Sequence, residues 1–480
     1  SDRQLTALSG EAMHNATKHW NKSVKHLGIK HELPEELVKL KREKTQAKLQ
    51  HLKQGYSEKE ELGSNGAVTP VVGTNFAGNW YDGGYPPDNS MAISNGGYIV
   101  SAVNSNIEYY NTAGTLLYTS SFYDFFNDGN LSATIYDPVV LYDSGADRFF
   151  MVVLHGGSSA TSKVIACFSK TNNPSDGWWI YQLEGNPLND NCWFDYPKIG
   201  VSTNEVYITG NLYNNSSNTA QQSVIYQIEK ASGYSGNSLI NQLWSSISEN
   251  PFTLVPASYG HQGNYGPGIY LASTYENGSA DKLLIFDLTD DMSGSPSLDV
   301  YSIDADFSLG GNAFQAGSSV ELNTGDNRGL SAFYLNGILH FVFHSEYTNN
   351  YNGINYNRIN VSGLTNISKK FGLDGYDYSY PSLASFSTSA TDQSVIIGFL
   401  RSNASIYPEF RVVNCDDNMN WSASTSVKAG VTYVDNGNVS ETRWGDYTGI
   451  SRKHNSSFEV WVAGQYGTTR NISGIGTANC

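Results

Sequence analysis

Short runs of alternating apolar and polar residues, repeated along most of the chain, constrain the fold more than any other feature. From about residue 70 onward, Gly, Asn, Asp and Ser separate these runs, as expected for strands joined by turns. The repeats, each opened by an Asp or its substitute and often next to Pro, predict an all-β, seven-bladed β-propeller. The seven openings are Pro87-Asp88-Asn89, Tyr136-Asp137-Pro138, Asp195-Tyr196-Pro197, Val255-Pro256-Ala257, Asn327-Arg328-Gly329, Ser379-Tyr380-Pro381 and Arg443-Trp444-Gly445.

The first 62 residues follow a helical period instead. A first helix is expected to end near Gly28, and a second to begin near Pro34 and end near Gly55. We therefore expect a helical hairpin or stalk over residues 1–62, a linker over 63–75 and the propeller over 76–480. The apolar stripe expected on the second helix consists of Leu37, Leu40, Ala47, Leu49 and Leu52.

Charge divides the 480-residue chain in the same place. The net charge is −16, and the excess of Lys and Arg is confined to residues 1–62. An acidic body argues against nucleic acid as a partner, because phosphate binding needs clustered basic residues. No apolar run is long enough to span a bilayer. The basic head is expected to contact a partner protein, a surface or a second copy of the chain, or else to be a solvated helix face.

Three motifs carry a resemblance to known proteins. In chain order they are Asp195-Tyr196-Pro197-Lys198-Ile199-Gly200, Tyr380-Pro381-Ser382-Leu383 and Arg443-Trp444-Gly445-Asp446-Tyr447-Thr448-Gly449. Over roughly residues 80–470 the chain resembles secreted bacterial seven-bladed propeller proteins, a largely uncharacterised group at the edge of the sialidase-like propellers. The resemblance implies the fold and an extracellular location, and it implies little about activity.

Four acidic residues occupy what the repeats suggest are equivalent positions near the propeller axis: Asp88, Asp137, Asp195 and Asp446. Carboxylates gathered there would repel one another unless a cation or hydrogen-bond donors neutralised them. One interpretation is a Ca²⁺ site, the only cofactor that the sequence suggests. The other is that each Asp caps its own turn and joins adjacent blades. A glycosidase site built on Asp195 and Asp446, with Arg443 beside them, is a third interpretation.

Aromatic residues in polar surroundings are candidates for ligand binding. Exposed rings stack on sugars and on partner proteins, whereas buried rings fill the space between blades. The candidates are Trp178, Trp179, Tyr347, Tyr351 and Tyr356.

The cysteines and the glycosylation sequons bear on location. Cys167, Cys192, Cys415 and Cys480 match no zinc-binding spacing, and we expect them to form disulfides in an oxidising, extracellular compartment. Asn-x-Ser/Thr sequons, among them Asn130, are consistent with secretion, although an Asn-rich chain makes many by chance. The chain begins at Ser1 without Met, and we expect a mature, processed form.

We therefore expect a secreted or cell-surface, non-catalytic propeller that binds glycan or protein. The alternative is a carbohydrate-active, sialidase-like hydrolase with its site at one end of the channel. A subunit of a filament, a matrix or another extracellular assembly is a third expectation, in which residues 1–62 would pack against another chain.

Overall fold

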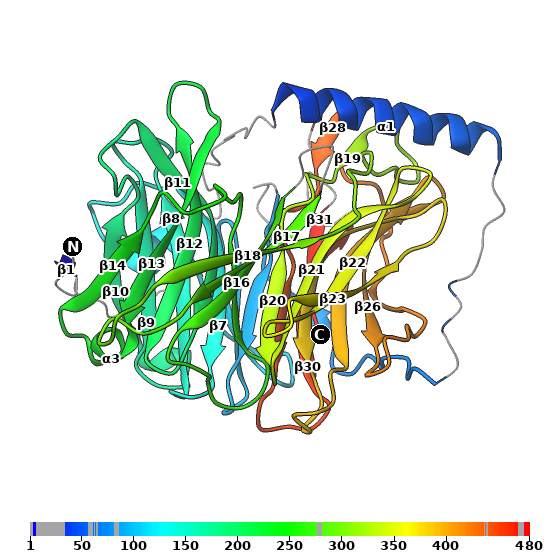
Figure 1. The fold of residues 1–480 in the computed structure, drawn as a ribbon. Coiled ribbons are helices and arrows are strands. Elements are labelled where there is room, and N and C mark those ends of the chain that lie inside the picture. The colour runs from blue at the N-terminus through cyan, green and yellow to red at the C-terminus, as the bar shows by residue number, and fades with distance from the viewer. Residues whose placement is uncertain are drawn as a thin grey trace.

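The protein is a mostly-β propeller with an N-terminal helix, α1, lying along one rim of the sheets (Figure 1). The computed structural model describes residues 3–5, 34–55, 61, 63, 66–80, 86–275, 281–435, 437, 440–468 and 475–480. The first predicted helix lies outside these residues. No helix within the described ranges has the length and apolar character that crossing a membrane requires.

Antiparallel meanders form the body. Four sheets have four strands each, and in one of them the early strand β2 pairs with the late strand β31 and so closes the ring. Their strands are β3 (Ser90–Ile93), β4 (Tyr98–Val103), β5 (Asn106–Asn111) and β6 (Leu116–Ser121); β7 (Ile135–Asp143), β8 (Arg148–His155), β9 (Lys163–Ser169) and β10 (Trp178–Glu184); β24 (Asp377–Ser385), β25 (Val395–Asn403), β26 (Ile406–Cys415) and β27 (Thr425–Lys428); and β29 (Gly449–Arg452), β30 (Val460–Gly467), β31 (Ile475–Asn479) and β2 (Phe76–Ala77).

Two larger sheets complete the body. A five-stranded sheet and an eight-stranded sheet bring the large sheets to six, where the repeats predicted seven blades. The eight-stranded sheet contains two four-stranded meanders, joined because the ends of β15 and β20 pair in parallel. The strands are β11 (Cys192–Val201), β12 (Glu205–Asn214), β13 (Ala220–Glu229), β14 (Leu239–Trp244) and β1 (Arg3–Leu5), then β15 (Val255–Tyr259), β16 (Ile269–Tyr275), β17 (Lys282–Leu288), β18 (Leu298–Asp304), β20 (Ser331–Leu335), β21 (Ile338–Thr348), β22 (Tyr351–Asn360) and β23 (Thr365–Phe371).

Smaller elements connect the sheets at their rims. Two short strands pair in parallel beneath α1, where Figure 1 labels them side by side. The remaining elements are β19 (Glu321–Asn323), β28 (Glu441–Arg443), α2 (Phe122–Phe126), α3 (Lys230–Ser235) and a 3-10 turn at Pro174–Asp176.

Helix α1 spans Glu35–Lys53 and follows Pro34, as the sequence predicts. Its buried face is polar rather than the expected leucine stripe, because Lys41, Thr45 and Lys48 are its buried residues and Ala47 is exposed. Lys48 is completely buried, and its Nζ lies 2.7 Å from Oδ2 and 2.8 Å from Oδ1 of Asp377 in β24. Polar contacts rather than an apolar stripe therefore hold α1 on the propeller, and the buried Lys48–Asp377 ion pair is the most buried of them.

The cysteines correct one prediction. All four are free, so the predicted disulfides are wrong. Cys167, Cys192 and Cys415 are buried in three separate core clusters, and Cys480 packs against a fourth. Each side chain thus fills apolar space within its own region of the core, as free cysteines commonly do.

Candidate functional site at the axial cavity

The innermost strands of the sheets line a partly open cavity of about 220 Å³ on the propeller axis. Its lining comes from β3, β7, β11, β15, β20, β24 and β29, which are the strands that open the sequence repeats. Inner-strand serines link neighbouring sheets around it, because each accepts a hydrogen bond from a backbone N–H of an adjacent sheet. The pairs are Ser90 with Val140 N (3.0 Å), Ser258 with Val201 N (3.0 Å), Ser331 with Leu383 N (3.3 Å) and Ser451 with Ile93 N (3.2 Å).

A left-handed residue lies just before one inner strand and in the first half of three others. Asp88, Asp137, Tyr196 and Tyr380 have φ values of 52°, 50°, 55° and 52°. Near the last three, the register of the sheet shifts by a bulge. The equivalent of Asp137 is therefore Tyr196, and the predicted equivalence of Asp195 is out by one residue.

Acidic residues near the starts of the inner strands tie the first, second and last sheets together. Asp88 Oδ1 accepts a hydrogen bond from Asp446 N at 2.8 Å, and Asp88 Oδ2 accepts one from Asn104 Nδ2 at 2.6 Å. Asn104 Oδ1 in turn accepts from Asp137 N at 2.7 Å. These contacts match the interpretation in which the acids join adjacent blades.

Burial also changes the protonation of two of these acids. It raises the pKa of Asp88 well above its usual value, and the neighbouring Asp446 adds to that rise. Burial raises the pKa of Asp137 as well, with further contributions from Asp195 and then Asp88. The raised pKa means that Asp88 and Asp137 keep their protons to a higher pH than isolated aspartates do.

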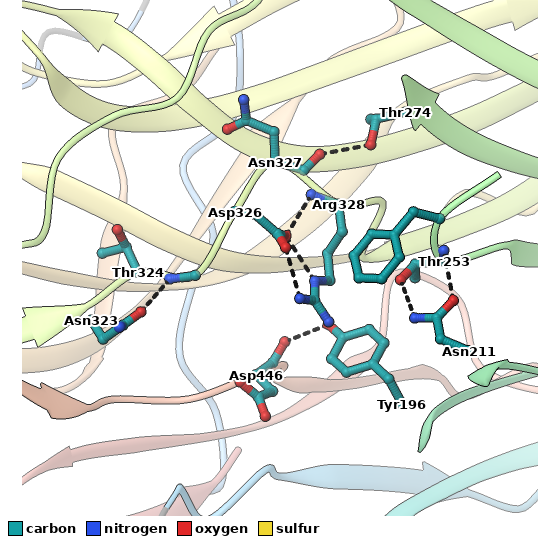
Figure 2. A network of polar contacts seen from close by, with 12 residues as sticks. Tyr196, Asn211, Thr253, Thr274, Asn323, Thr324, Asp326, Asn327, Arg328 and Asp446 are labelled. Atoms are coloured by element: carbon teal, nitrogen blue, oxygen red, sulfur yellow. Dashed lines mark hydrogen bonds and ion pairs between the residues drawn. The ribbon is translucent and has the colours of Figure 1, made fainter. Parts of the chain in front are cut away.

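A cationic and aromatic layer lies beside the acids. Figure 2 shows the guanidinium of Arg328 between Asp326 and Tyr196, and the hydroxyl of Tyr196 next to Asp446. Nε and Nη2 of Arg328 each donate to Asp326 at 2.7 Å, and the guanidinium carbon lies 4.3 Å from the centre of the Tyr196 ring. The hydroxyl of Tyr196 donates to the backbone oxygen of Asp446 at 2.9 Å.

Lys198 brings a second buried cation to the cavity wall. Its Nζ lies 4.9 Å from the ring centre of Tyr196 and 4.8 Å from that of Tyr447. Burial, together with the charge of Arg328, lowers the pKa of Lys198 to about 8, although Asp137 opposes the shift. Tyr447 is held by its hydroxyl, which donates to the Pro138 oxygen at 3.1 Å.

The predicted catalytic residues are partly brought together. Arg443 forms an ion pair with Asp446, and these side chains keep 35% and 21% of their surfaces exposed. Asp195 is buried and lies close enough to Asp137 to raise its pKa. Among the described residues, no three His, Cys, Asp or Glu side chains are grouped closely enough to hold a metal ion.

Most of the aromatic residues proposed for binding lie in the core. Trp178 is buried and donates from Nε1 to the Tyr109 hydroxyl at 2.9 Å, and Tyr351 and Tyr356 are also buried. Trp179 is partly covered by Lys170, whose Nζ lies 4.5 Å from its ring. Of this set, Tyr347 alone is an exposed side chain.

A pair of exposed tyrosines was missed by the sequence analysis. Tyr407 and Tyr433 are 36% and 40% exposed, and Val431, two residues before Tyr433, is also exposed. Both rings flank Gly317: a methyl group on its Cα would lie 3.2 Å from Cε1 of Tyr407 and 3.4 Å from Cδ1 of Tyr433. The segments are far apart in sequence, so no local pattern could have paired them.

Comparison with known proteins gives a fold-level likeness. No protein-family model and no curated protein matches the chain. Solved structures similar to it include a Trypanosoma rangeli sialidase in complex with the inhibitor DANA (TM-score 0.41, 9% identity, 78% of this chain and 57% of that chain) and the phage phi92 endosialidase (0.40, 8%, 69% and 65%). A chain of the mitotic checkpoint complex is also similar (0.42, 11%, 88% and 98%). This chain thus spans less than two thirds of the length of those two sialidases, and it is a β-propeller similar to sialidases and other propellers at low sequence identity.

Proposed function

We propose that this protein is a non-catalytic binding propeller that takes a glycan on the exposed pair Tyr407 and Tyr433. The supporting observation is the placement of both rings around Gly317, which leaves two aromatic surfaces open to solvent at one spot. Aromatic rings of this kind offer large contact area at little entropic cost. Of the two ligand classes expected from the sequence, glycan and protein, this proposal takes the glycan and places it on different residues.

Glycan binding can be tested by affinity electrophoresis of the full chain through gels containing soluble polysaccharides. For a polysaccharide that retards the native chain, the Tyr407→Ala/Tyr433→Ala variant should bind about 10-fold more weakly, a loss of about 1.4 kcal/mol. Tyr123→Ala is the matched control, because Tyr123 is an exposed tyrosine in helix α2, away from Tyr407 and Tyr433 in the chain. Equal retardation of the double variant and the native chain would refute the tyrosine platform.

We further propose an extracellular location and membership of the secreted bacterial propeller group. With the cysteines free, these proposals rest on the low charged fraction of 15%, the sequons and the shared motifs. We count seven blades in this proposal, taking the eight-stranded sheet as two. Because α1 uses its buried face on its own propeller, a partner protein, a surface or a second copy would meet its outer face or the residues before it.

A glycoside hydrolase is the second candidate, favoured by one observation. Burial raises the pKa of Asp88 and of Asp137, and both lie near the Arg443–Asp446 pair, so a candidate proton donor and an ion-paired carboxylate share one end of the axis. If the protein hydrolyses fluorogenic glycosides, Asp446→Asn should lower the rate at least about 100-fold, in line with the loss of an acid–base group. A rate that survives Asp446→Asn would exclude this site.

A further inference from the structure

A buried arginine that forms no ion pair with an acid of the described residues lines the axial cavity. Arg452, the last residue of β29, lines the cavity and is only 5% exposed. Its Nη1 donates to the Ser385 hydroxyl at 3.0 Å, whereas its Nε is buried without a partner. Burial lowers the pKa of Arg452, and no acid within the described ranges is paired with it. Buried charges in proteins are normally compensated, so this one calls for a counter-charge.

Two histidines add to the same end of the cavity. His454 lines the cavity, and His261 follows Gly260, which also lines it. Nδ1 of His454 and Nε2 of His261 are buried without hydrogen-bond partners. Burial, together with the charges of Arg452 and then His261, lowers the pKa of His454 to about 3. Burial and then Arg452 also lower the pKa of His261, which Asp392 opposes.

None of these three nitrogens, Nε of Arg452, Nδ1 of His454 and Nε2 of His261, has a hydrogen-bond partner among the described residues. Each belongs to a group that is cationic or becomes cationic on protonation, and each is shielded from water. An oxyanion in the cavity would accept from Nε of Arg452 and from the imidazoles once these are protonated. Its charge would also offset the mutual repulsion of the three groups.

The dimensions and walls of the cavity fit such a ligand. A cavity of about 220 Å³ exceeds the roughly 150 Å³ that holds a benzene molecule in an engineered core. Serine hydroxyls line its length, among them Ser258 and Ser331, whereas the Ser385 hydroxyl already donates to the Gly260 oxygen. Hydroxyls can donate to anion oxygens, so the walls are compatible with a polar guest.

We propose that the axial cavity binds a compact oxyanion, a phosphate, sulfate or carboxylate group, at Arg452, His454 and His261. This site is separate from the Tyr407 and Tyr433 surface and does not depend on it. The anion would neutralise the buried guanidinium and bridge β29 to the loop after β15.

Isothermal titration calorimetry on the full chain in a chloride-based Bis-Tris buffer tests the proposal. Sodium phosphate, sodium sulfate and sodium acetate are titrated separately, which distinguishes tetrahedral anions from carboxylates. At least one should bind at a single site, and Arg452→Gln should weaken that binding at least 10-fold. Lys163→Gln is the control, because it removes the same charge from an exposed pair with Glu184 on β9 and β10. Absence of binding by all three anions, or unchanged affinity of Arg452→Gln, would overturn the proposal.

A second variant keeps the test decisive if Arg452→Gln does not fold. His454→Asn should weaken the same anion several-fold while retaining the melting temperature in chloride buffer. The stabilising effect of the anion on the native chain, measured by thermal unfolding, should shrink in parallel. An anion-induced rise in melting temperature that is the same in His454→Asn and in the native chain would count against the site.

Discussion

Replacing Lys48 by methionine removes the positive end of the buried ion pair that fixes α1 to the propeller. Asp377 would lose the two contacts from Lys48 Nζ, at 2.7 and 2.8 Å. It would keep the bonds from Asn352 N at 2.9 Å and Asn352 Nδ2 at 2.8 Å. Removing one partner of a buried pair costs about 3–5 kcal/mol, and the retained bonds place this case near 3 kcal/mol.

The loss should appear first as opening of the helix. Hydrogen exchange of the α1 amides should accelerate about 100-fold, since each 1.4 kcal/mol is a factor of ten. Lys44→Met is the matched control on the same helix. Its pair with Glu346, at 2.6 Å, is 23% and 21% exposed, so that variant should cost less than about 1 kcal/mol.

A double variant separates the charge from the packing. Lys48→Met/Asp377→Asn removes both charges, and it should recover more than half of the protection lost in Lys48→Met. The reasoning would be refuted if α1 exchanged no faster in Lys48→Met than in Lys44→Met. It would also fail if the double variant were as unprotected as the single one.

Three further predictions concern the axis and the core. The raised pKa of Asp137 means that the folded state keeps a proton that the unfolded chain loses near pH 4, so the free energy of unfolding should fall as the pH rises above about 4. Asp137→Asn should reduce this fall, measured by urea unfolding at pH 5 and pH 8, by about 1.4 kcal/mol for each unit of pKa shift. An equal fall in the variant and the native chain would contradict the prediction. Tyr447→Phe should cost about 1 kcal/mol through the lost bond to the Pro138 oxygen, whereas Tyr123→Phe, at an exposed position, should be neutral in the same assay. Thiol titration of the denatured chain without reductant should find four free thiols. The native chain should react slowly, because burial raises the pKa of Cys192 to about 11 and that of Cys415 to about 12. A change in mobility between reducing and non-reducing gels would show that the cysteines form disulfides.

The sequence predicts the propeller because strand repetition is a local property. The dipeptides Asp137-Pro138, Tyr196-Pro197 and Tyr380-Pro381 show where the inner strands bulge. The alignment nevertheless matched Asp195 with Asp137, since it followed residue type rather than the position before proline. At the position before the proline, the side chain changes from Asp137 to Tyr196 and Tyr380, while the left-handed backbone conformation stays the same.

Contacts between residues far apart in the chain could not be predicted from local sequence patterns. The stripe on α1 was assigned from its leucines, but the buried face depends on Asp377, which follows more than 300 residues later. Trp178 resembled a loop residue, yet it begins β10 and is buried through its bond to Tyr109. Likewise, nothing local to Arg452 indicates that it faces a cavity rather than an acid.

The pairing of β2 with β31 has a consequence for biosynthesis. Phe76 pairs with Asn479 and Ala77 with Ala478, so the last sheet gains its outer strand from a segment translated long before its other strands. During translation β2 stays unpaired until β31 is made. Until the two strands pair, β2 and the open edge of the last sheet can pair with strands of other chains. The rate of ring closure, rather than the stability of any single sheet, would then govern how much newly made protein escapes aggregation.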